Sequence, residues 1–240
     1  QISIIYFAIY IGDISLTSLR IQFLDQLNNN LFFNYFFVTF CILILINGTN
    51  FIDGLNGLVL GYFSLIFITM YLTDLTNAIF LKEKIFIFII CLVILFFFNI
   101  TNKIFLGDNG SYLLGVFCSI TLIQLYNNND FSPFFVVLLL WYPCFELLFS
   151  MLRRSLNEIN SYKPDTFHLH HLIFKKLSSL FGTNNKLITH GITTISINSY
   201  NLFIFIISIN FIYNSDILIA ILTVNIILYI LLYSYLKKEN

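Results

Sequence analysis

The chain alternates between long apolar runs and shorter polar segments, a pattern that predicts membrane-crossing helices joined by loops. Several runs reach the roughly 17 to 25 residues that a helix needs to cross a bilayer. They are continuously apolar and do not alternate as barrel strands do. The apolar runs that we expect to cross are 32–46, 58–72, 85–98, 112–126, 133–152, 195–213 and 217–236, after a shorter run at 1–11. We therefore predict an all-α, polytopic helical membrane protein, a single domain over residues 1–240 with about seven full spans and a partial first helix.

Composition strengthens this prediction. The 240 residues are 58% apolar and only 10% charged, with a mean hydropathy of +0.87, which is far from an ordinary soluble domain. The formal net charge is zero, which indicates neither a nucleic-acid nor a generally acidic partner, and the apolar runs make the lipid bilayer an expected partner. Cys41, Cys91, Cys118 and Cys144 each lie inside an apolar run, so we interpret them as small hydrophobic residues and not as disulfides or zinc ligands.

The order of the spans predicts which segments share a side of the membrane. Segments 47–57, 99–111, 153–192 and the C-terminal tail fall on one side by counting crossings. That side carries nine of the twelve basic residues, namely Lys103, Arg153, Arg154, Lys163, Lys175, Lys176, Lys186, Lys237 and Lys238, and leaves Arg20, Lys82 and Lys84 for the other. By the positive-inside rule it faces the cytoplasm.

The first of these segments, Asn47 to Gly57, reads Asn-Gly-Thr-Asn-Phe-Ile-Asp-Gly-Leu-Asn-Gly. A solvated turn between two spans would explain a polar loop. Its amide and carboxylate oxygens, with glycines that let a backbone approach a ligand closely, favour a site for phosphate or a hard cation. Asn47, Asn50, Asp53 and Asn56 are the candidate residues of this loop.

The second segment ends in Phe-Leu-Gly-Asp-Asn-Gly-Ser, from Phe105 to Ser111, and places Asp108 between glycines just before a span. A carboxylate there could be a helix N-cap. Asp53 lies on the same side in a similar glycine-flanked loop. Two carboxylates with nearby amides predict a Mg²⁺ site, since Mg²⁺ takes oxygen ligands and completes its shell with water and phosphates.

The third segment contains Pro-Asp-Thr-Phe-His-Leu-His-His, with His168, His170 and His171 within four residues. Such a cluster could bind a transition metal. Because no cysteine is nearby, we favour binding or proton transfer at a phosphorylated substrate. Arg153 and Arg154 could pair with its phosphates, although a basic pair at a cytoplasmic helix end is also ordinary topology.

Glu146 and His190 lie outside these motifs. Glu146 lies inside an apolar run, where an acid is costly and usually faces a cavity or a partner. We expect it to support the arginines or to line the site. His190 lies outside the histidine cluster in the sequence, and we interpret it as having no role in the site.

At these residues the chain resembles the polyprenyl-phosphate N-acetylhexosamine-1-phosphate transferases. Asn47 to Gly57 is similar to the family's Asn-x-x-Asn-x-x-Asp-Gly-x-Asp/Asn-Gly loop, Phe105 to Ser111 to its Phe-x-Gly-Asp-x-Gly-Ser loop, and Asp165 to His171 to its Asp-x-x-His-x-His-His motif. The His-Leu-His-His form is closer to the branch that transfers GlcNAc-1-phosphate to undecaprenyl phosphate. The three motifs stand in the family's order.

The resemblance implies transfer of a sugar-1-phosphate from a UDP-N-acetylhexosamine to undecaprenyl phosphate, with release of UMP, at the cytoplasmic face of a bacterial plasma membrane. Asp53 and Asp108 carry over as catalytic carboxylates that hold Mg²⁺, with Mn²⁺ as the alternative. The three histidines carry over as groups near the diphosphate-sugar, and Asn50 as an amide of the site. Homodimerisation is left open.

Departures from the family's pattern leave two other classes open. Asn56 and Thr166 stand where many members have Asp and Arg, and no adjacent acidic pair occurs, although the family has one in an earlier cytoplasmic loop. We expect that pair upstream of Gln1, in a longer protein. The alternatives are a transporter or flippase for a phosphorylated lipid, and a catalytically dead membrane scaffold.

Overall fold

The structure is a computed structural model that describes residues 1–73, 79–156, 167–181 and 186–239. Ten helices and no strands occur in these ranges. They are α1 (Ile2–Ile11), α2 (Gln22–Asn28), α3 (Leu31–Ile52), α4 (Leu58–Leu72), α5 (Ile79–Ile100), α6 (Gly107–Asn127), α7 (Pro133–Leu156), α8 (Leu169–Phe181), α9 (Lys186–Ile209) and α10 (Ser215–Glu239). The predicted all-α class is confirmed.

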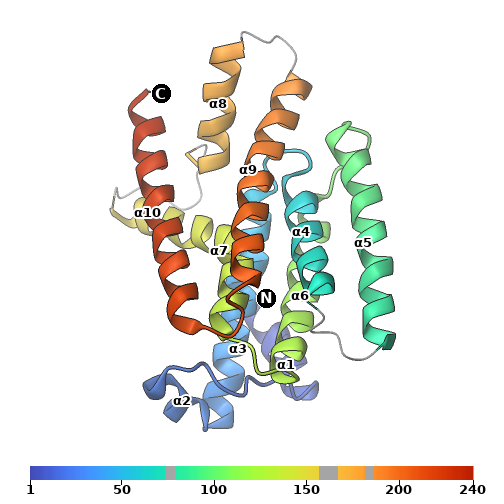
Figure 1. The fold of residues 1–240 in the computed structure, drawn as a ribbon, viewed down its shortest axis with the longest axis vertical. Helices are drawn as coiled ribbons and strands as arrows, with labels where there is room; N and C mark the ends of the chain where they lie inside the picture. The colour runs from blue at the N-terminus through green and yellow to red at the C-terminus, as the bar shows by residue number, and fades with distance from the viewer. Residues whose placement is uncertain (74–78, 157–166, 182–185, 240) are drawn as a thin grey trace.

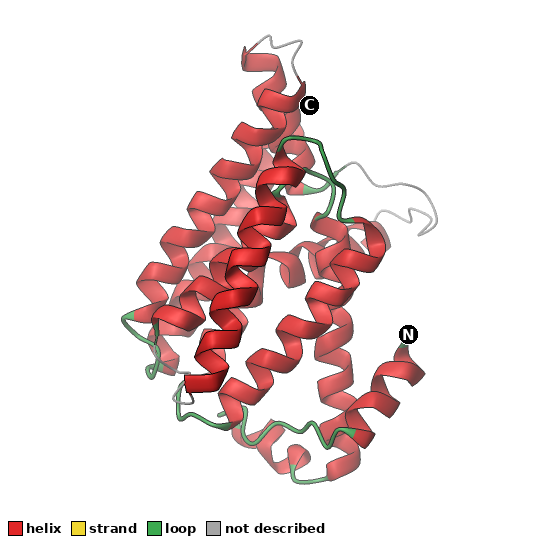
Figure 2. Cartoon of the chain, turned by 90° about the vertical axis from the view of Figure 1, so that its right-hand side faces the viewer, coloured by secondary structure: helices red, strands yellow, loops and turns green. Residues whose placement is uncertain are grey.

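The long helices run lengthwise as one bundle, with their connections at its two ends (Figures 1 and 2). Helix α3 packs against α1, α6 and α7, whereas α4 packs against α5 and α9. Helix α8 lies against α9 and α10. The buried core is largely aliphatic and aromatic, with Tyr62, Phe63, Phe67 and Phe205 among its fully buried side chains.

Five helices are long and apolar enough to cross a membrane. They are Leu31–Ile52, Lys82–Ile100, Pro133–Leu156, Lys186–Ile209 and Ser215–Lys238. Two further predicted spans are helices of the same bundle that fall short of this measure, since α4 has only 15 residues and α6 has a lower mean hydropathy along its 21 residues. The polytopic membrane class is therefore supported.

Several helices extend beyond the apolar runs that predicted them. Helix α3 continues to Ile52, so the first six residues of the predicted 47–57 loop are helical. Helix α6 begins at Gly107 and includes Asp108. Helix α9 begins at Lys186, nine residues before its predicted span. Hydropathy marks the part of a helix that suits lipid, whereas the backbone can remain helical past that point.

Helix α7 changes direction along its length, and its second half runs sideways across the bundle (Figure 1). Pro143 lies inside this helix, and a proline removes one i→i−4 hydrogen bond and kinks the helix. The carbonyl that loses its partner, Leu139 O, instead accepts a hydrogen bond from the buried Tyr62 hydroxyl at 2.8 Å. Gly48 of α3 packs on the kink, because a Cβ there would lie 2.4 Å from Pro143 O.

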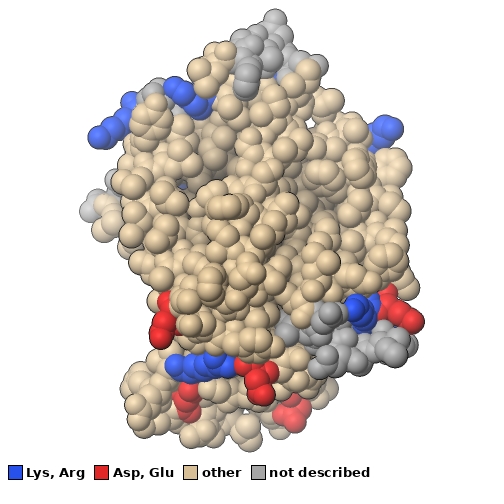
Figure 3. Space-filling view, in the orientation of Figure 1, with Lys and Arg blue, Asp and Glu red and all other residues tan. Residues whose placement is uncertain are grey.

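The predicted candidate segments meet at one end of the bundle. The α3–α4 and α5–α6 connections, the start of α8 and the C terminus all lie in its upper part in Figure 1. On the face drawn in Figure 3, Lys and Arg appear at this end without acidic side chains, whereas acidic and basic side chains mix at the other end. The shared side that was predicted by counting crossings is therefore present, and its cytoplasmic orientation stays a prediction.

Candidate active site

The last turn of α3 meets the first turn of α6. The Asn50 side-chain amide donates to Asp108 Oδ1 at 2.9 Å and to Ser111 Oγ at 3.3 Å. Ser111 in turn donates to the backbone carbonyl of Asp108 at 3.0 Å. The first two sequence motifs are thus joined directly, and the amide of one orients the carboxylate of the other.

Asp53 lies at the C-cap of α3, beside the start of α6. Burial and the nearby charge of Asp108 raise the pKa of Asp53 to about 7, against the opposing effect of a backbone hydrogen bond from Gly107. Two carboxylates that repel each other in this way form a site of concentrated negative charge. A divalent cation would relieve that repulsion.

The third motif packs against the same loop through Gly54. A Cβ at this position would lie 2.7 Å from His171 Cε1 and 2.9 Å from His170 Nε2. These distances are shorter than real Cβ contacts, so the residue after Asp53 must lack a side chain for the imidazoles to come this close. The structure therefore brings His170 and His171 to the Asp53 loop.

The histidine rings also contact one another. The His170 and His171 ring centroids are 4.2 Å apart, and His168 stacks on His170 at 5.5 Å. His170 is fully buried, and neither of its ring nitrogens has a hydrogen-bond partner among the described residues. Burial, with the charges of its two neighbouring histidines, lowers the pKa of His170 well below its usual value. Its imidazole is therefore neutral at pH 7 and could accept a hydrogen bond from a ligand.

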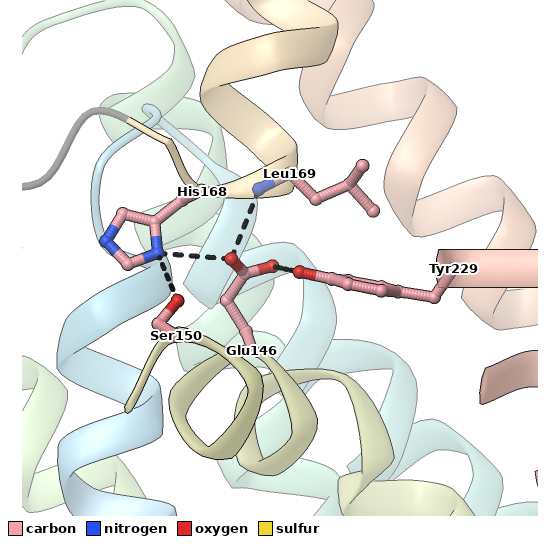
Figure 4. Close-up of polar contacts among 5 residues, drawn as sticks. All are labelled: Glu146, Ser150, His168, Leu169 and Tyr229. Atoms are coloured by element: carbon pink, nitrogen blue, oxygen red, sulfur yellow. Dashed lines mark hydrogen bonds and ion pairs between the residues drawn. The ribbon is translucent and has the colours of Figure 1, made fainter. Parts of the chain in front are cut away.

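His168 is held from inside the membrane region by Glu146 of α7 (Figure 4). His168 Nδ1 lies 3.1 Å from Glu146 Oε1 and 3.2 Å from Ser150 Oγ. The Leu169 N–H and the Tyr229 hydroxyl also donate to the Glu146 carboxylate, at 3.1 and 2.8 Å. These contacts place Glu146 beside the start of α8, next to the third motif, and the expectation that it supports the arginines stays a prediction.

Asn47 and Asn56 occupy different surroundings. Asn47 donates to Leu43 O in its own helix at 2.7 Å. Asn56 donates to Asn102 Oδ1 at 2.7 Å, and its backbone carbonyl accepts from Thr194 at 2.7 Å. Asn56 therefore ties the α3–α4 loop to the α5–α6 loop and to α9, and its described contacts are with neither Asp53 nor Asp108.

Asn99 was not among the predicted site residues, yet it connects the same loops. Its side-chain oxygen accepts from Gly57 N–H, and its amide donates to Ile104 O at 2.9 Å. Asn99 is almost fully buried. The signal for Asn99 in the sequence is an amide at the end of an apolar run.

Arg153 and Arg154 lie in the last turn of α7. The Arg153 guanidinium is buried and lies 5.8 Å from the ring centroids of both Phe167 and Tyr233. A role in phosphate binding stays a prediction for both arginines. The predicted motif residues Asp165 and Thr166 lie outside the described residues.

The oxygen donors at the α3–α6 contact suit a hard cation. Asp53 and Asp108 supply carboxylates, and Asn50 already orients one of them. No group of three or more His, Cys, Asp or Glu side chains that could hold a metal occurs among the described residues. A cation at this pair would therefore take its remaining ligands from water or phosphate oxygens, as Mg²⁺ commonly does.

Comparison with known proteins adds independent findings. Residues 1–126 match the sequence model of the family described as glycosyl transferase family 4, which includes the first two motifs and ends before the histidines. No solved structure matches the chain.

Curated relatives match over part of the chain. An undecaprenyl-phosphate alpha-N-acetylglucosaminyl 1-phosphate transferase of Thermotoga maritima is 30% identical over 55% of this chain and 40% of its own length. A probable undecaprenyl-phosphate N-acetylglucosaminyl 1-phosphate transferase of Bacillus subtilis is 32% identical over 59% of this chain and 39% of its own length. The undecaprenyl-phosphate alpha-N-acetylglucosaminyl 1-phosphate transferase of Escherichia coli K12 is 28% identical over 60% of this chain and 41% of its own length. The matches thus span about two fifths of these relatives.

Proposed function

The chain belongs to glycosyl transferase family 4, and we propose that the protein transfers an N-acetylhexosamine-1-phosphate from a UDP-sugar to undecaprenyl phosphate and releases UMP. The reaction takes place at the cytoplasmic surface of a bacterial plasma membrane. The names of the relatives support both the lipid acceptor and a GlcNAc donor.

One observation carries the proposal. Asn50, Asp53 and Asp108 meet at one end of the bundle, and His170 and His171 lie against the same loop. Segments from the second, third and fourth fifths of the chain thus supply carboxylates and imidazoles to one place. This arrangement supports a site for a diphosphate, because it combines cation ligands with groups that can bind phosphate oxygens.

The chemistry that this site must perform is a phosphoryl transfer. An oxygen of the lipid phosphate attacks the β-phosphorus of the UDP-sugar, the bond from that phosphorus to the bridging oxygen breaks, and UMP leaves with the electron pair. Little covalent chemistry is required of the protein, so positioning and neutralisation of charge dominate.

Each candidate residue then has a definite task. Asp53 and Asp108 would hold Mg²⁺, with Mn²⁺ as the alternative, and the ion would supply charge neutralisation at the diphosphate. Asn50 keeps the Asp108 carboxylate oriented. His170 offers a neutral imidazole and His171 a second ring beside the same loop.

The remaining candidates lie around this centre. Arg153 and Arg154 supply positive charge at the end of α7, where the lipid phosphate would arrive. Asn47 and Asn56 support the helix and the loop that carry Asp53.

The experiment is UMP release by the full-length gene product in detergent, with UDP-GlcNAc, undecaprenyl phosphate and Mg²⁺. We expect UMP and a lipid-linked sugar in equal amounts, loss of both with EDTA, and recovery when Mg²⁺ or Mn²⁺ is returned in excess. No UMP from any UDP-N-acetylhexosamine donor would contradict the proposal and favour a lipid-phosphate transporter or a membrane scaffold.

A further inference from the structure

The carboxylate of Glu146 receives three hydrogen-bond donors from two parts of the fold, the start of α8 and the helix α10. Its Oε1 accepts from Leu169 N–H at 3.1 Å and lies 3.1 Å from His168 Nδ1, and its Oε2 accepts from the Tyr229 hydroxyl at 2.8 Å (Figure 4). The side chain is fully buried in an apolar helix. A buried carboxylate in such a place is destabilising unless its oxygens accept hydrogen bonds. The three donors therefore offset the cost of burying Glu146.

We propose that Glu146 is a positioning residue of the transfer reaction, which sets the tautomer of His168 and fixes the first turn of α8 so that His170 and His171 face the Asp53 loop. The inference rests on the proposed function, and it concerns a residue that touches neither the carboxylate pair nor the Asn50 contact. It acts through the histidines.

The tautomer follows from the donor and acceptor roles. An ionised carboxylate can only accept hydrogen bonds, so the His168 nitrogen beside it, Nδ1, carries the proton. Nε2 is then the nitrogen with the lone pair in the neutral ring. Ser150 lies 3.2 Å from the same Nδ1 and can adapt its hydroxyl to either role, whereas the carboxylate cannot.

The position of α8 follows from the second contact. Leu169 is the first residue of α8, and its N–H is one of those that have no partner within the helix. A carboxylate at this end also interacts favourably with the helix dipole. His170 and His171 come next along the helix, and both lie within 3 Å of the position that a Gly54 Cβ would take. A shift of the helix start is therefore transmitted to the site.

The kink in α7 places the acid where it can do this. Pro143 precedes Glu146 by three residues, and the second half of α7 turns sideways toward α8 and α10 (Figure 1). The Pro143 kink, the Tyr229 hydroxyl and the start of α8 thus meet at a single side chain. A purely structural role for Glu146 would use the same contacts, so the test must separate the two.

The test compares Glu146→Met and Glu146→Asp in the full-length protein. Met is close to Glu in size but has no oxygen that accepts hydrogen bonds, so it removes the acceptor that holds the proton on His168 Nδ1 and leaves the Ser150 hydroxyl, which can adapt to either tautomer. We expect kcat for UMP release to fall by about 10- to 100-fold, the range found when partners of active-site ligands are removed, with KM for UDP-GlcNAc changed less than about threefold. Asp, which keeps both oxygens, is expected to recover part of kcat.

A spectroscopic readout does not depend on turnover. In protein labelled with ¹⁵N-histidine, the long-range ¹H–¹⁵N correlation of His168, assigned through His168→Asn, reports which ring nitrogen carries the proton. We expect protonation at Nδ1 in the parent and a move toward Nε2 in Glu146→Met. Tyr35→Phe is the matched control, because it removes a hydroxyl that donates to Asp13 at 2.6 Å near the start of α3, at the opposite end of that helix from Asn50 and Asp53, and it should leave both readouts unchanged.

The outcomes separate the two claims. An unchanged tautomer and an unchanged kcat in Glu146→Met, in a protein whose parent releases UMP, would overturn the inference and leave the proposed function intact. A lost kcat with an unchanged tautomer, and no recovery with Asp, would also overturn it, because Glu146 would then be a structural residue only. If the parent releases no UMP, the proposed function fails and the catalytic inference fails with it, whereas the tautomer still reports the Glu146–His168 contact.

Discussion

Gly54→Ala probes the contact between the Asp53 loop and the histidines. An alanine Cβ would lie 2.7 Å from His171 Cε1 and 2.9 Å from His170 Nε2, whereas ordinary contacts begin at 3.4 Å. To restore ordinary contact, the added Cβ must therefore move away from His171 Cε1 by about 0.7 Å and from His170 Nε2 by about 0.5 Å. His170 is fully buried and cannot easily move aside, so the Asp53 loop has to shift.

A displacement of this size matters for a reaction that depends on positioning. Misplacement by about 1 Å can cost about 100-fold in rate, so we expect kcat for UMP release to fall by about 10- to 100-fold. The backbone at Gly54 does not need a positive φ, so the effect is steric. The assay is steady-state UMP release, with the melting temperature measured on the same preparations.

Gly191→Ala is the matched control. Gly191 lies in α9, and the nearest atom to an added Cβ there is Ile100 Cδ1 at 4.0 Å. We expect activity within about twofold of the parent and a slightly higher melting temperature, because alanine favours a helix over glycine by about 1 kcal/mol. If Gly54→Ala were as active as Gly191→Ala, the close approach of the histidines to the Asp53 loop would have no part in catalysis.

Three further changes test other parts of the account, each by thermal unfolding in detergent. Gly48→Ala would place a Cβ 2.4 Å from Pro143 O. Because that oxygen is a backbone atom, we expect the free energy of unfolding to fall by about 1–3 kcal/mol. An unchanged melting temperature would contradict the tight α3–α7 contact. Tyr62→Phe removes the hydroxyl that donates to Leu139 O at the kink, and should lower the free energy of unfolding by about 1–3 kcal/mol. No change in that free energy would mean that the hydroxyl does not replace the missing helical hydrogen bond. Burial and the neighbouring Asp108 carboxylate raise the pKa of Asp53 to about 7, above the usual value near 4 for an aspartate. Protonated Asp53 therefore contributes to the stability of the folded protein in full below about pH 4, and this contribution is lost as the pH rises through 7. With EDTA present, the parent should therefore melt at a lower temperature at pH 8 than at pH 5 by a larger margin than Asp53→Asn; equal margins would contradict the raised pKa.

The helical membrane fold was predictable because long apolar runs carry their own signal. The meeting of the first two motifs was also predictable, since counting crossings put Asp53 and Asp108 on one side. The helix boundaries were not, because polar residues such as Asn50 continue a helix whose apolar part has ended. Local patterns report burial in lipid and say little about where a helix stops.

The parts of the site that sequence reasoning missed depend on contacts between distant residues. Glu146 was expected to support the arginines or to line the site, but spacing along α7 could not show that it meets His168 and Leu169 at the start of α8. Asn56 is a candidate for substrate binding by its place in the motif, and the sequence could not show that it also bonds Asn102 across the two loops. Asn99 carried no motif, and only its contact with Gly57 reveals its role.

The most direct test of the central claim is the turnover of Asp108→Asn beside the parent. The account predicts that UMP release falls by at least about 100-fold, because one of the two carboxylates that would hold the cation is lost, while the melting temperature stays within a few degrees. Near-parental turnover in a folded Asp108→Asn protein would contradict the claim that the α3–α6 contact, with its paired carboxylates, is the centre of phosphoryl transfer.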